Sequence, residues 1–429
     1  MSTDTLQALR RGDLTGVREL RLSGLGLTEL PPEILGLAET LEVLDLGHNA
    51  LTCLPPDFAR LKRLRVLFCS GNRFDRLPSV LGDCPALSQV GFRGTGMREV
   101  PGEALPPALR WLILTDNAIA RLPASLGERP ALQKLMLAGN HLSELPSSLA
   151  GSAQLELLRL SVNRFRRLPP WLGELPRLAW LAWGANPLDR GIPPPAAPRA
   201  AWPDLALGLM LGEGTSGRVH HALWHGRPVA LKLFKGGMTS DGLPEREMAA
   251  CLAAGEHPHL SGGLARLGGH PEGVEGLLMP LLPEGWRVLA GPPSLESCSR
   301  DVYDPALRLA PATLLRLVRG IAAAAAHLHA RGLLHGDLYA HNILWDGGDG
   351  QAVLSDFGAA SHLPQGAEGG ALRRLEVRAW GLLLGELLDR CENAPAWLRL
   401  LEHRCVQPDT AARPGMAEVA AALERAAPG

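Results

Sequence analysis

The chain has 429 residues, which is too long for one ordinary hydrophobic core, so two or three folded units are expected. Its formal net charge of -1 at pH 7 excludes the strong uniform field that holds nucleic acid or anionic lipid. The seven cysteines include no Cys-x-x-Cys pair, so neither a disulfide framework nor a zinc site is indicated. Specific sites must therefore carry the function.

A membrane is not expected as a partner either. The N-terminal residues show no uninterrupted apolar segment after a basic patch, as a secretion signal requires. The most apolar stretch, residues 314–334, is interrupted by Arg316, Arg319 and Arg331, which a membrane-spanning helix tolerates poorly. We therefore expect a cytoplasmic protein without a nucleic-acid or membrane partner.

The first half of the chain is a repeat array. The segment 41–63, LEVLDLGHNALTCLPPDFARLKR, recurs with a period of roughly 23 residues, giving about eight units from residue 17 to residue 190. The leucines predict a short strand on a shared parallel sheet, and the prolines predict the start of a return segment. An asparagine recurs at the same position in most of the units, and each one predicts a buried amide that satisfies backbone groups. These residues are Asn49, Asn72, Asn117, Asn140, Asn163 and Asn186.

The repeat resembles the leucine-rich-repeat family, since a motif in register over this many units is very rarely accidental. The resemblance implies an α/β solenoid over residues 1–190. The strand positions between the leucines are expected to form a concave face, which would bind a protein substrate or partner, or the chain's own second domain. A third interpretation is that these side chains only cover the sheet. They are Val43, Val66, Phe68, Trp111, Ile113, Met136, Leu157 and Trp180.

Residues 191–204 are rich in proline and alanine, which predicts an extended linker. Residues 205–429 then show strand-like runs followed by long helical patterns, among them 313–331 and 375–389. This half is expected to be a separate domain.

A glycine-rich segment opens this domain with the residues Gly212-Glu213-Gly214-Thr215-Ser216-Gly217-Arg218-Val219. The same spacing occurs in ordinary hairpin turns, so the context decides. The run VALK, ending at Lys232, predicts an apolar strand that carries a compact ammonium suited to phosphates and a carboxylate. Glu247, in a helical stretch, is the expected carboxylate, and Glu245 is its rival.

Two later motifs are more specific. They read His335-Gly336-Asp337-Leu338-Tyr339-Ala340-His341-Asn342 and Ser355-Asp356-Phe357-Gly358. Phosphoryl transfer needs a carboxylate that orients the acceptor hydroxyl, together with an amide and a second carboxylate that hold magnesium. Asp337, Asn342 and Asp356 follow the order and spacing of the protein-kinase motifs.

With these motifs in order, the second half resembles the protein-kinase superfamily over nearly its full length. The resemblance implies an α+β bilobal fold that binds ATP and Mg²⁺ between its lobes. It also implies catalytic roles for Asp337, Lys232 and Glu247, and metal binding by Asn342 and Asp356. The residues it places at the nucleotide are Leu211, Gly212, Glu213, Gly214, Thr215, Ser216, Gly217, Val219, Lys232, Met279 and Leu281.

Several residues depart from the family's pattern. Gly336 stands where most kinases carry an arginine that receives a phosphorylated activation loop, so no such phosphate should be needed. Tyr339 replaces the lysine that follows the catalytic aspartate by two residues. The stretch after Asp356 is short, so a peptide-docking loop is largely missing. Glu376 replaces a structural aspartate, and Arg413 lacks its customary glutamate partner.

Three functions remain open at this point. The first is an ATP-dependent serine/threonine protein kinase whose repeats recruit a protein substrate. The second is a small-molecule kinase, because the His-Gly-Asp-x-x-x-x-Asn motif also resembles that of aminoglycoside phosphotransferases. The third is a pseudokinase scaffold, which is disfavoured because a scaffold needs neither Lys232 nor the three motif residues Asp337, Asn342 and Asp356.

Overall fold

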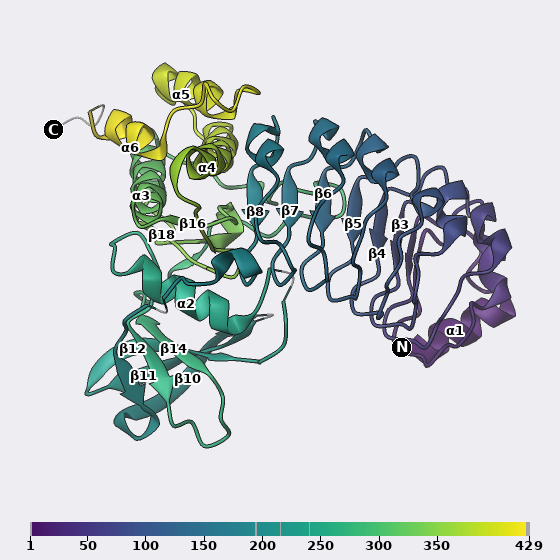
Figure 1. The fold of residues 1–429 in the computed structure, drawn as a ribbon. Helices are drawn as coiled ribbons and strands as arrows, with labels where there is room; N and C mark the ends of the chain where they lie inside the picture. Colours follow the sequence, from purple (N-terminus) through teal and green to yellow (C-terminus); the bar gives the residue numbers. More distant parts are fainter. Residues whose placement is uncertain (1, 194, 215, 240, 426–429) are drawn as a thin grey trace. The chain divides into compact units, whose positions relative to one another are not determined.

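The computed structural model describes residues 2–193, 195–214, 216–239 and 241–425 (Figure 1). The chain divides by its contacts into two compact units, Met1–Pro169 and Pro170–Gly429. Within the described residues, no helix combines the length and the apolar character needed to cross a membrane.

The first unit is built from the repeats. After helix α1 (Ser2–Arg11), each repeat contributes one short strand, and the strands pair in parallel and in chain order (Figure 1). Val43 pairs with Val66, and Val66 with Gln89, so successive repeats stay in register. The strands are β1 (Glu19–Arg21), β2 (Val43–Asp45), β3 (Val66–Phe68), β4 (Gln89–Gly91), β5 (Trp111–Ile113), β6 (Lys134–Met136) and β7 (Leu157–Arg159).

The spacing of apolar and polar residues explains this architecture. The middle residue of every strand from β2 to β7 is fully buried, because alternate residues of a strand point to opposite faces. The return segments are short 3-10 helices, and several begin directly after a proline, as expected. They are Pro32–Leu37, Pro56–Arg60, Ser79–Asp83, Gly102–Ala104, Ala124–Glu128 and Ser147–Gly151.

The asparagines form the predicted ladder. Asn72 Oδ1 accepts a hydrogen bond from the Leu51 N–H (2.9 Å), and Asn72 Nδ2 donates to the carbonyls of Leu46 (2.9 Å) and Cys69 (2.8 Å). Asn140, three repeats later, makes the equivalent bonds to Ile119, Leu114 and Leu137. Backbone groups that the turns leave unpaired are thereby satisfied inside the solenoid.

The second unit begins at Pro170, in the return segment of the seventh repeat, and includes the whole eighth repeat. It contains the 3-10 helix η7 (Pro170–Glu174), the strand β8 (Trp180–Ala182), which is the eighth of the repeat series, and the 3-10 helix η8 (Pro187–Asp189). The expected repeat domain, residues 1–190, is defined by the repeats in the sequence, and its limits remain a prediction. By its contacts, the last repeat belongs with the residues that follow it.

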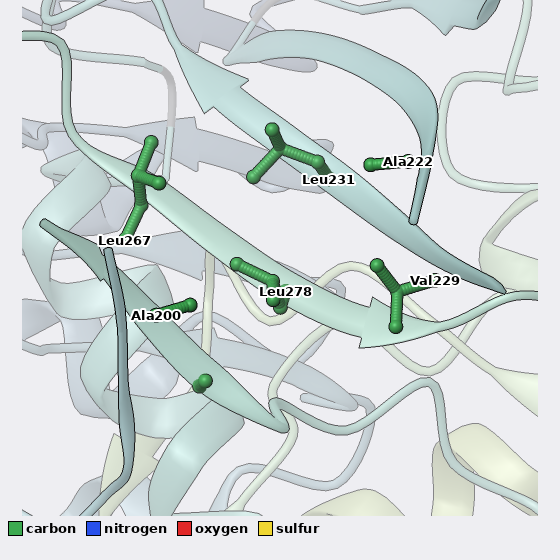
Figure 2. Packing of buried hydrophobic residues seen from close by; sticks show 7 residues of the cluster. Ala200, Ala222, Val229, Leu231, Leu267 and Leu278 are labelled. Atoms are coloured by element: carbon green, nitrogen blue, oxygen red, sulfur yellow. The ribbon is translucent and has the colours of Figure 1, made fainter. Parts of the chain in front are cut away.

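A six-stranded sheet forms the small lobe of this unit, with strand order β10-β11-β12-β14-β13-β9. Its apolar core contains Ala200, Ala222, Val229, Leu231 and Leu278, which face one another in Figure 2. Ala200 lies in β9, so part of the segment expected to be a linker pairs with β13. The strands are β9 (Arg199–Ala201), β10 (Leu205–Glu213), β11 (Gly217–Trp224), β12 (Arg227–Phe234), β13 (Ala265–Gly268) and β14 (Gly276–Pro280), and helix α2 (Pro244–Ala254) accompanies them.

The large lobe is mainly helical. The expected helix over 313–331 is α3 (Pro311–Ala330), but the helix expected to start near Leu375 is α4 (Gly366–Leu388). That expected start is wrong because three of the first five residues of α4 are glycines, whose low helix propensity hides a turn that tertiary packing stabilises. The other elements are β15 (Arg287–Val288), β16 (Leu333–Leu334), η10 (Ala340–Asn342), β17 (Ile343–Trp345), β18 (Ala352–Leu354), β19 (Ser361–His362), α5 (Ala396–Val406) and α6 (Met416–Arg425). The α/β solenoid and the α+β two-lobed domain predicted from the sequence are both present.

Candidate active site

The glycine-rich segment connects strands β10 and β11. The Gly214 N–H donates to the Gly217 carbonyl (2.9 Å) and closes the turn. A Cβ atom at Gly217 would lie 2.5 Å from the Leu233 carbonyl oxygen, so the packing of the sheet requires glycine there. At Gly212 and Gly214 a Cβ atom would meet none of the described atoms within 4 Å, which is consistent with a ligand approaching the backbone. Thr215 lies outside the described residues.

The sheet register brings three of the expected nucleotide residues into one row. Gly212 on β10 pairs with Val219 on β11, and Val219 pairs with Lys232 on β12. Leu211, next to this row, has 54% of its surface exposed. An apolar side chain is thus left uncovered beside the glycine segment, where a nucleotide base would cover it.

Met279 and Leu281 lie where the small lobe leads into the rest of the unit. Met279 pairs with Ala230 at the end of β14, and Leu281 follows directly after that strand. Both side chains are half-buried. This position agrees with the expected connection between the lobes.

Glu213 and Ser216 are tied within the loop by one lysine. Lys235 Nζ contacts Glu213 Oε1 (2.8 Å) and donates to the Gly214 carbonyl (2.9 Å), while its N–H donates to the Ser216 carbonyl (3.0 Å). The hydrogen bonds from Lys235 and Arg218 lower the pKa of Glu213, which keeps this exposed carboxylate charged. Lys235 therefore restrains the loop, a role that sequence reasoning did not assign to it.

Lys232 and Glu247 form an ion pair between β12 and α2. Their side chains are only 13% and 6% exposed. Burial alone lowers the pKa of Lys232, but the carboxylates of Glu247 and Asp356 outweigh burial and raise it overall, so the lysine remains a cation. Glu245 is exposed on the same helix turn, because residues two positions apart on a helix point in different directions. Of the two candidates, Glu247 is the carboxylate that contacts Lys232.

The two later motifs meet at Asn342. Its Nδ2 donates to the carbonyl oxygen (2.9 Å) and to Oδ2 (2.8 Å) of Asp337. Ser355 donates to the Asn342 carbonyl from its N–H and its hydroxyl, both at 2.8 Å. Asp356, the next residue, has a φ of 61° and accepts a hydrogen bond from the Gly358 N–H (3.0 Å). The fold thus brings Asp337, Asn342 and Asp356 together from two separate segments.

The donor atoms of this group fit magnesium bound together with a nucleotide. The Asn342 amide oxygen and the Asp356 carboxylate are the hard oxygen ligands that Mg²⁺ prefers. Among the described residues no cluster of three or more His, Cys, Asp or Glu side chains could hold a metal ion by itself. A magnesium ion here would therefore complete its ligands with phosphate oxygens and water.

Glu376 holds the start of the catalytic loop, the segment 335–342. Its Oε1 accepts from the Gly336 N–H (2.8 Å), and its Oε2 contacts His329 Nε2 (2.8 Å). Burial raises the pKa of Glu376, but the bonds from His329 and the Gly336 N–H outweigh burial and lower it overall. Glu376, expected from the sequence to replace a structural aspartate, thus links helix α4 to helix α3 and to the start of the loop.

The glycine at position 336, where the sequence resemblance leads one to expect an arginine, has a steric cause. The residue has a φ of 75°, and a Cβ atom there would lie 2.6 Å from the Leu181 carbonyl oxygen and 2.8 Å from that of Ala359. No arginine can occupy this position while strand β8 remains in place. At Tyr339, the second departure, the phenol ring stacks on Trp180 with ring centroids 4.1 Å apart and an interplanar angle of 8°.

Sequence reasoning missed Asp301. Its Oδ2 accepts from the His341 N–H (3.1 Å) and its Oδ1 contacts His341 Nδ1 (2.7 Å). Burial lowers the pKa of His341, but the bond to Asp301 and the nearby carboxylates raise it overall. Asp301 lies in an irregular loop outside every motif, so nothing local in the sequence marks it.

Curated relatives match about a quarter of the chain. The chain is 36% identical to Podocan of Mus musculus over 113 residues, 33% identical to Vasorin of Homo sapiens over 123 residues, and 34% identical to Leucine-rich repeat-containing protein 58 of Homo sapiens over 118 residues. These matches cover 24% to 27% of this chain and 18% to 32% of the relatives. The chain therefore spans less than a third of the length of each of these proteins.

Two family models match the chain. The leucine rich repeat model matches residues 15–74 and 107–188, and the protein tyrosine and serine/threonine kinase model matches residues 205–373. The second match contains the glycine segment, the Lys232–Glu247 pair and the group around Asp337. The chain contains leucine rich repeats followed by a protein tyrosine and serine/threonine kinase domain.

Proposed function

We propose that the protein is an ATP-dependent serine/threonine protein kinase and that its repeats bind the protein substrate. The observation that carries the proposal is the group formed by Lys232, Glu247 and Asp356 together with the Asn342–Asp337 contact. A folded scaffold gains nothing from a largely buried lysine kept charged by two carboxylates, since burying charges costs free energy. A site that binds phosphates needs that cation.

Each residue has a definite task in this proposal. Lys232, oriented by Glu247, contacts the phosphates of ATP, and Asn342 and Asp356 hold Mg²⁺. The Asp337 carboxylate orients the acceptor hydroxyl and takes its proton while the oxygen forms the new bond to phosphorus. When bound, Mg-ATP supplies the γ-phosphoryl group, whose bond to the ADP oxygen breaks. Asn342 Nδ2, bonded to Asp337 Oδ2, fixes the direction of that carboxylate.

A cytoplasmic location is also part of the proposal. All seven cysteines are free, and six of them are buried. Proteins of oxidising compartments usually pair their cysteines, whereas buried free thiols are common in reducing compartments. The concave positions of the repeats, such as the Phe68–Trp111 edge-to-face pair, would supply the substrate contacts.

The test is transfer of labelled γ-phosphate from Mg-ATP to the protein itself, to generic protein acceptors and to an aminoglycoside panel, followed by phosphoamino-acid analysis. Label on serine or threonine with the wild type, and none with Asp337→Asn or Lys232→Met, is the expected result. Label on tyrosine would reject the serine/threonine assignment. Label on the aminoglycosides alone would show a small-molecule kinase, and no label on any acceptor would favour a scaffold.

A further inference from the structure

The last leucine-rich repeat and the large lobe of the kinase domain belong to one compact unit. Arg413 Nη2 donates to the Pro176 carbonyl (2.7 Å), and Arg378 Nε donates to the Arg177 carbonyl (3.1 Å). Arg413, which lacks the glutamate partner usual in the family, thus binds the backbone that leads directly into the last repeat. A repeat held in this way is a fixed part of the lobe.

Strand β8 of this repeat also contacts the catalytic loop directly. Trp180 Nε1 donates to the Leu338 carbonyl (3.0 Å), one residue after Asp337. The indole stacks on Tyr339 on one side, and the guanidinium of Arg300 lies 5.2 Å from its ring centroid. Trp180 is only 2% exposed, so neither contact competes with water. The hydrogen bond and the stack fix two consecutive residues that follow Asp337.

The same strand leaves no place for regulation by a phosphate. The Leu181 carbonyl occupies the space of any side chain at position 336, where most kinases have the phosphate-binding arginine. Ser361, the only hydroxyl residue between Asp356 and helix α4, is 2% exposed and accepts a hydrogen bond from the Trp183 N–H (3.0 Å). A kinase cannot phosphorylate Ser361 while β8 stays in place.

We propose that Trp180 is a positioning residue for phosphoryl transfer, and that the last repeat holds the catalytic loop in place of a phosphorylated activation loop. The inference rests on the proposed kinase function. Glu376 and Asp301 fix the two ends of the loop, and Trp180 fixes the residues between them. Asp337 and Asn342 can then keep their mutual geometry without any modification of the chain.

The experiment compares full-length wild type with Trp180→Ala, Trp180→Phe and Trp171→Ala. Trp171, half-buried on η7 in the preceding return segment, has no hydrogen bond or ring contact with the catalytic loop among the described residues, so it is the matched control. Hydrogen–deuterium exchange of peptides from residues 335–345 measures the loop itself. Steady-state kinetics on an acceptor protein give kcat and the KM for ATP, and calorimetry gives the stoichiometry of ATP binding.

Trp180→Ala should raise loop exchange and lower kcat, each by roughly tenfold to a hundredfold, because a hydrogen bond and an aromatic contact are lost together. The KM for ATP and the ATP stoichiometry should stay unchanged, which separates mispositioning from loss of folded protein. Trp180→Phe, which keeps a ring against Tyr339, should recover part of kcat. Trp171→Ala should match the wild type.

Loop exchange and kcat of Trp180→Ala equal to those of Trp171→Ala would overturn the proposal. If Trp180→Ala fails to fold, the comparison of Trp180→Phe with Trp171→Ala decides in the same way. If the wild type transfers no phosphate, the proposed function fails by itself. The exchange data then still decide whether Trp180 holds the loop.

Discussion

Glu376→Gln is the most informative single change, because it alters charge at the base of the catalytic loop while keeping the shape of the side chain. Glu376 has only 1% of its side chain exposed and bonds to the Gly336 N–H and to His329, both at 2.8 Å. The amide can still accept from the Gly336 N–H. It loses the charge that strengthens both bonds.

The size of the effect follows from these two contacts. Hydrogen bonds to a charged group contribute about 1.5–3 kcal/mol, against roughly 1 kcal/mol for neutral pairs. Converting both bonds should therefore lower the local free energy of unfolding by about 2 kcal/mol. Glu376→Ala removes both bonds, leaves a cavity and should cost about 4 kcal/mol or more.

The effect should depend on pH in one direction. The folded state lowers the pKa of Glu376 below its ordinary value of 4.5, so its contribution to stability is complete above that value. The contribution is lost as the pH falls through the folded-state pKa. The difference between wild type and Glu376→Gln should accordingly be full at pH 7 and should shrink in acid.

The assay is hydrogen–deuterium exchange of the full chain in a urea series, followed in peptides from residues 329–345 and 370–388, so that the kinase domain is measured separately. Glu368→Gln, an exposed change in the first turn of the same helix, is the control and should shift stability by less than about 0.5 kcal/mol. Equal stabilities for Glu376→Gln and Glu368→Gln, or a difference that grows in acid, would refute the reasoning.

Three further changes probe other parts of the chain. Asn72→Ala removes three hydrogen bonds to buried backbone groups and should destabilise the repeats by about 2–4 kcal/mol in thermal unfolding, whereas a loss under 1 kcal/mol would contradict the ladder's role. Burial and the nearby His327 and His259 lower the pKa of His257 to about 4, so the stability of the folded protein should fall as the pH drops from 6.5 toward 4. His257→Leu should flatten the dependence of the melting temperature on pH. An unchanged dependence would count against this role of His257. Gly217→Ala places a Cβ atom against the Leu233 carbonyl and should weaken ATP binding, measured by calorimetry, about tenfold or more. Gly226→Ala, in the turn between β11 and β12, is the comparison and should leave ATP binding intact.

Much of the fold could be predicted because its signals are local. The roughly 23-residue period specifies strand, turn and return segment within each repeat, and those contacts join neighbouring repeats. The kinase motifs are equally local, since Asp337 and Asn342 lie five residues apart in one loop and bond to each other. At these sites, residues that are close in the sequence are also close in the folded protein, so the motifs alone predict the contacts.

Other features depended on which residues pack against each other. Burial selected Glu247 over Glu245, since only one of them faces Lys232 from helix α2. The glycines at the start of α4 concealed its first turn until its packing was known. Propensity and spacing could not decide these points, because the deciding partners lie elsewhere in the chain.

The sequence by itself determined the two architectures, their order and the residues of the kinase motifs. Only the tertiary structure revealed that the last repeat supplies part of the kinase domain. Trp180 and Leu338 are separated by 158 positions, and a hydrogen bond over that distance leaves no periodicity or motif in either segment. The glycine at position 336 likewise departs from the family's pattern in the sequence. Its causes are the positive φ and the carbonyls of Leu181 and Ala359, which only folding brings against it.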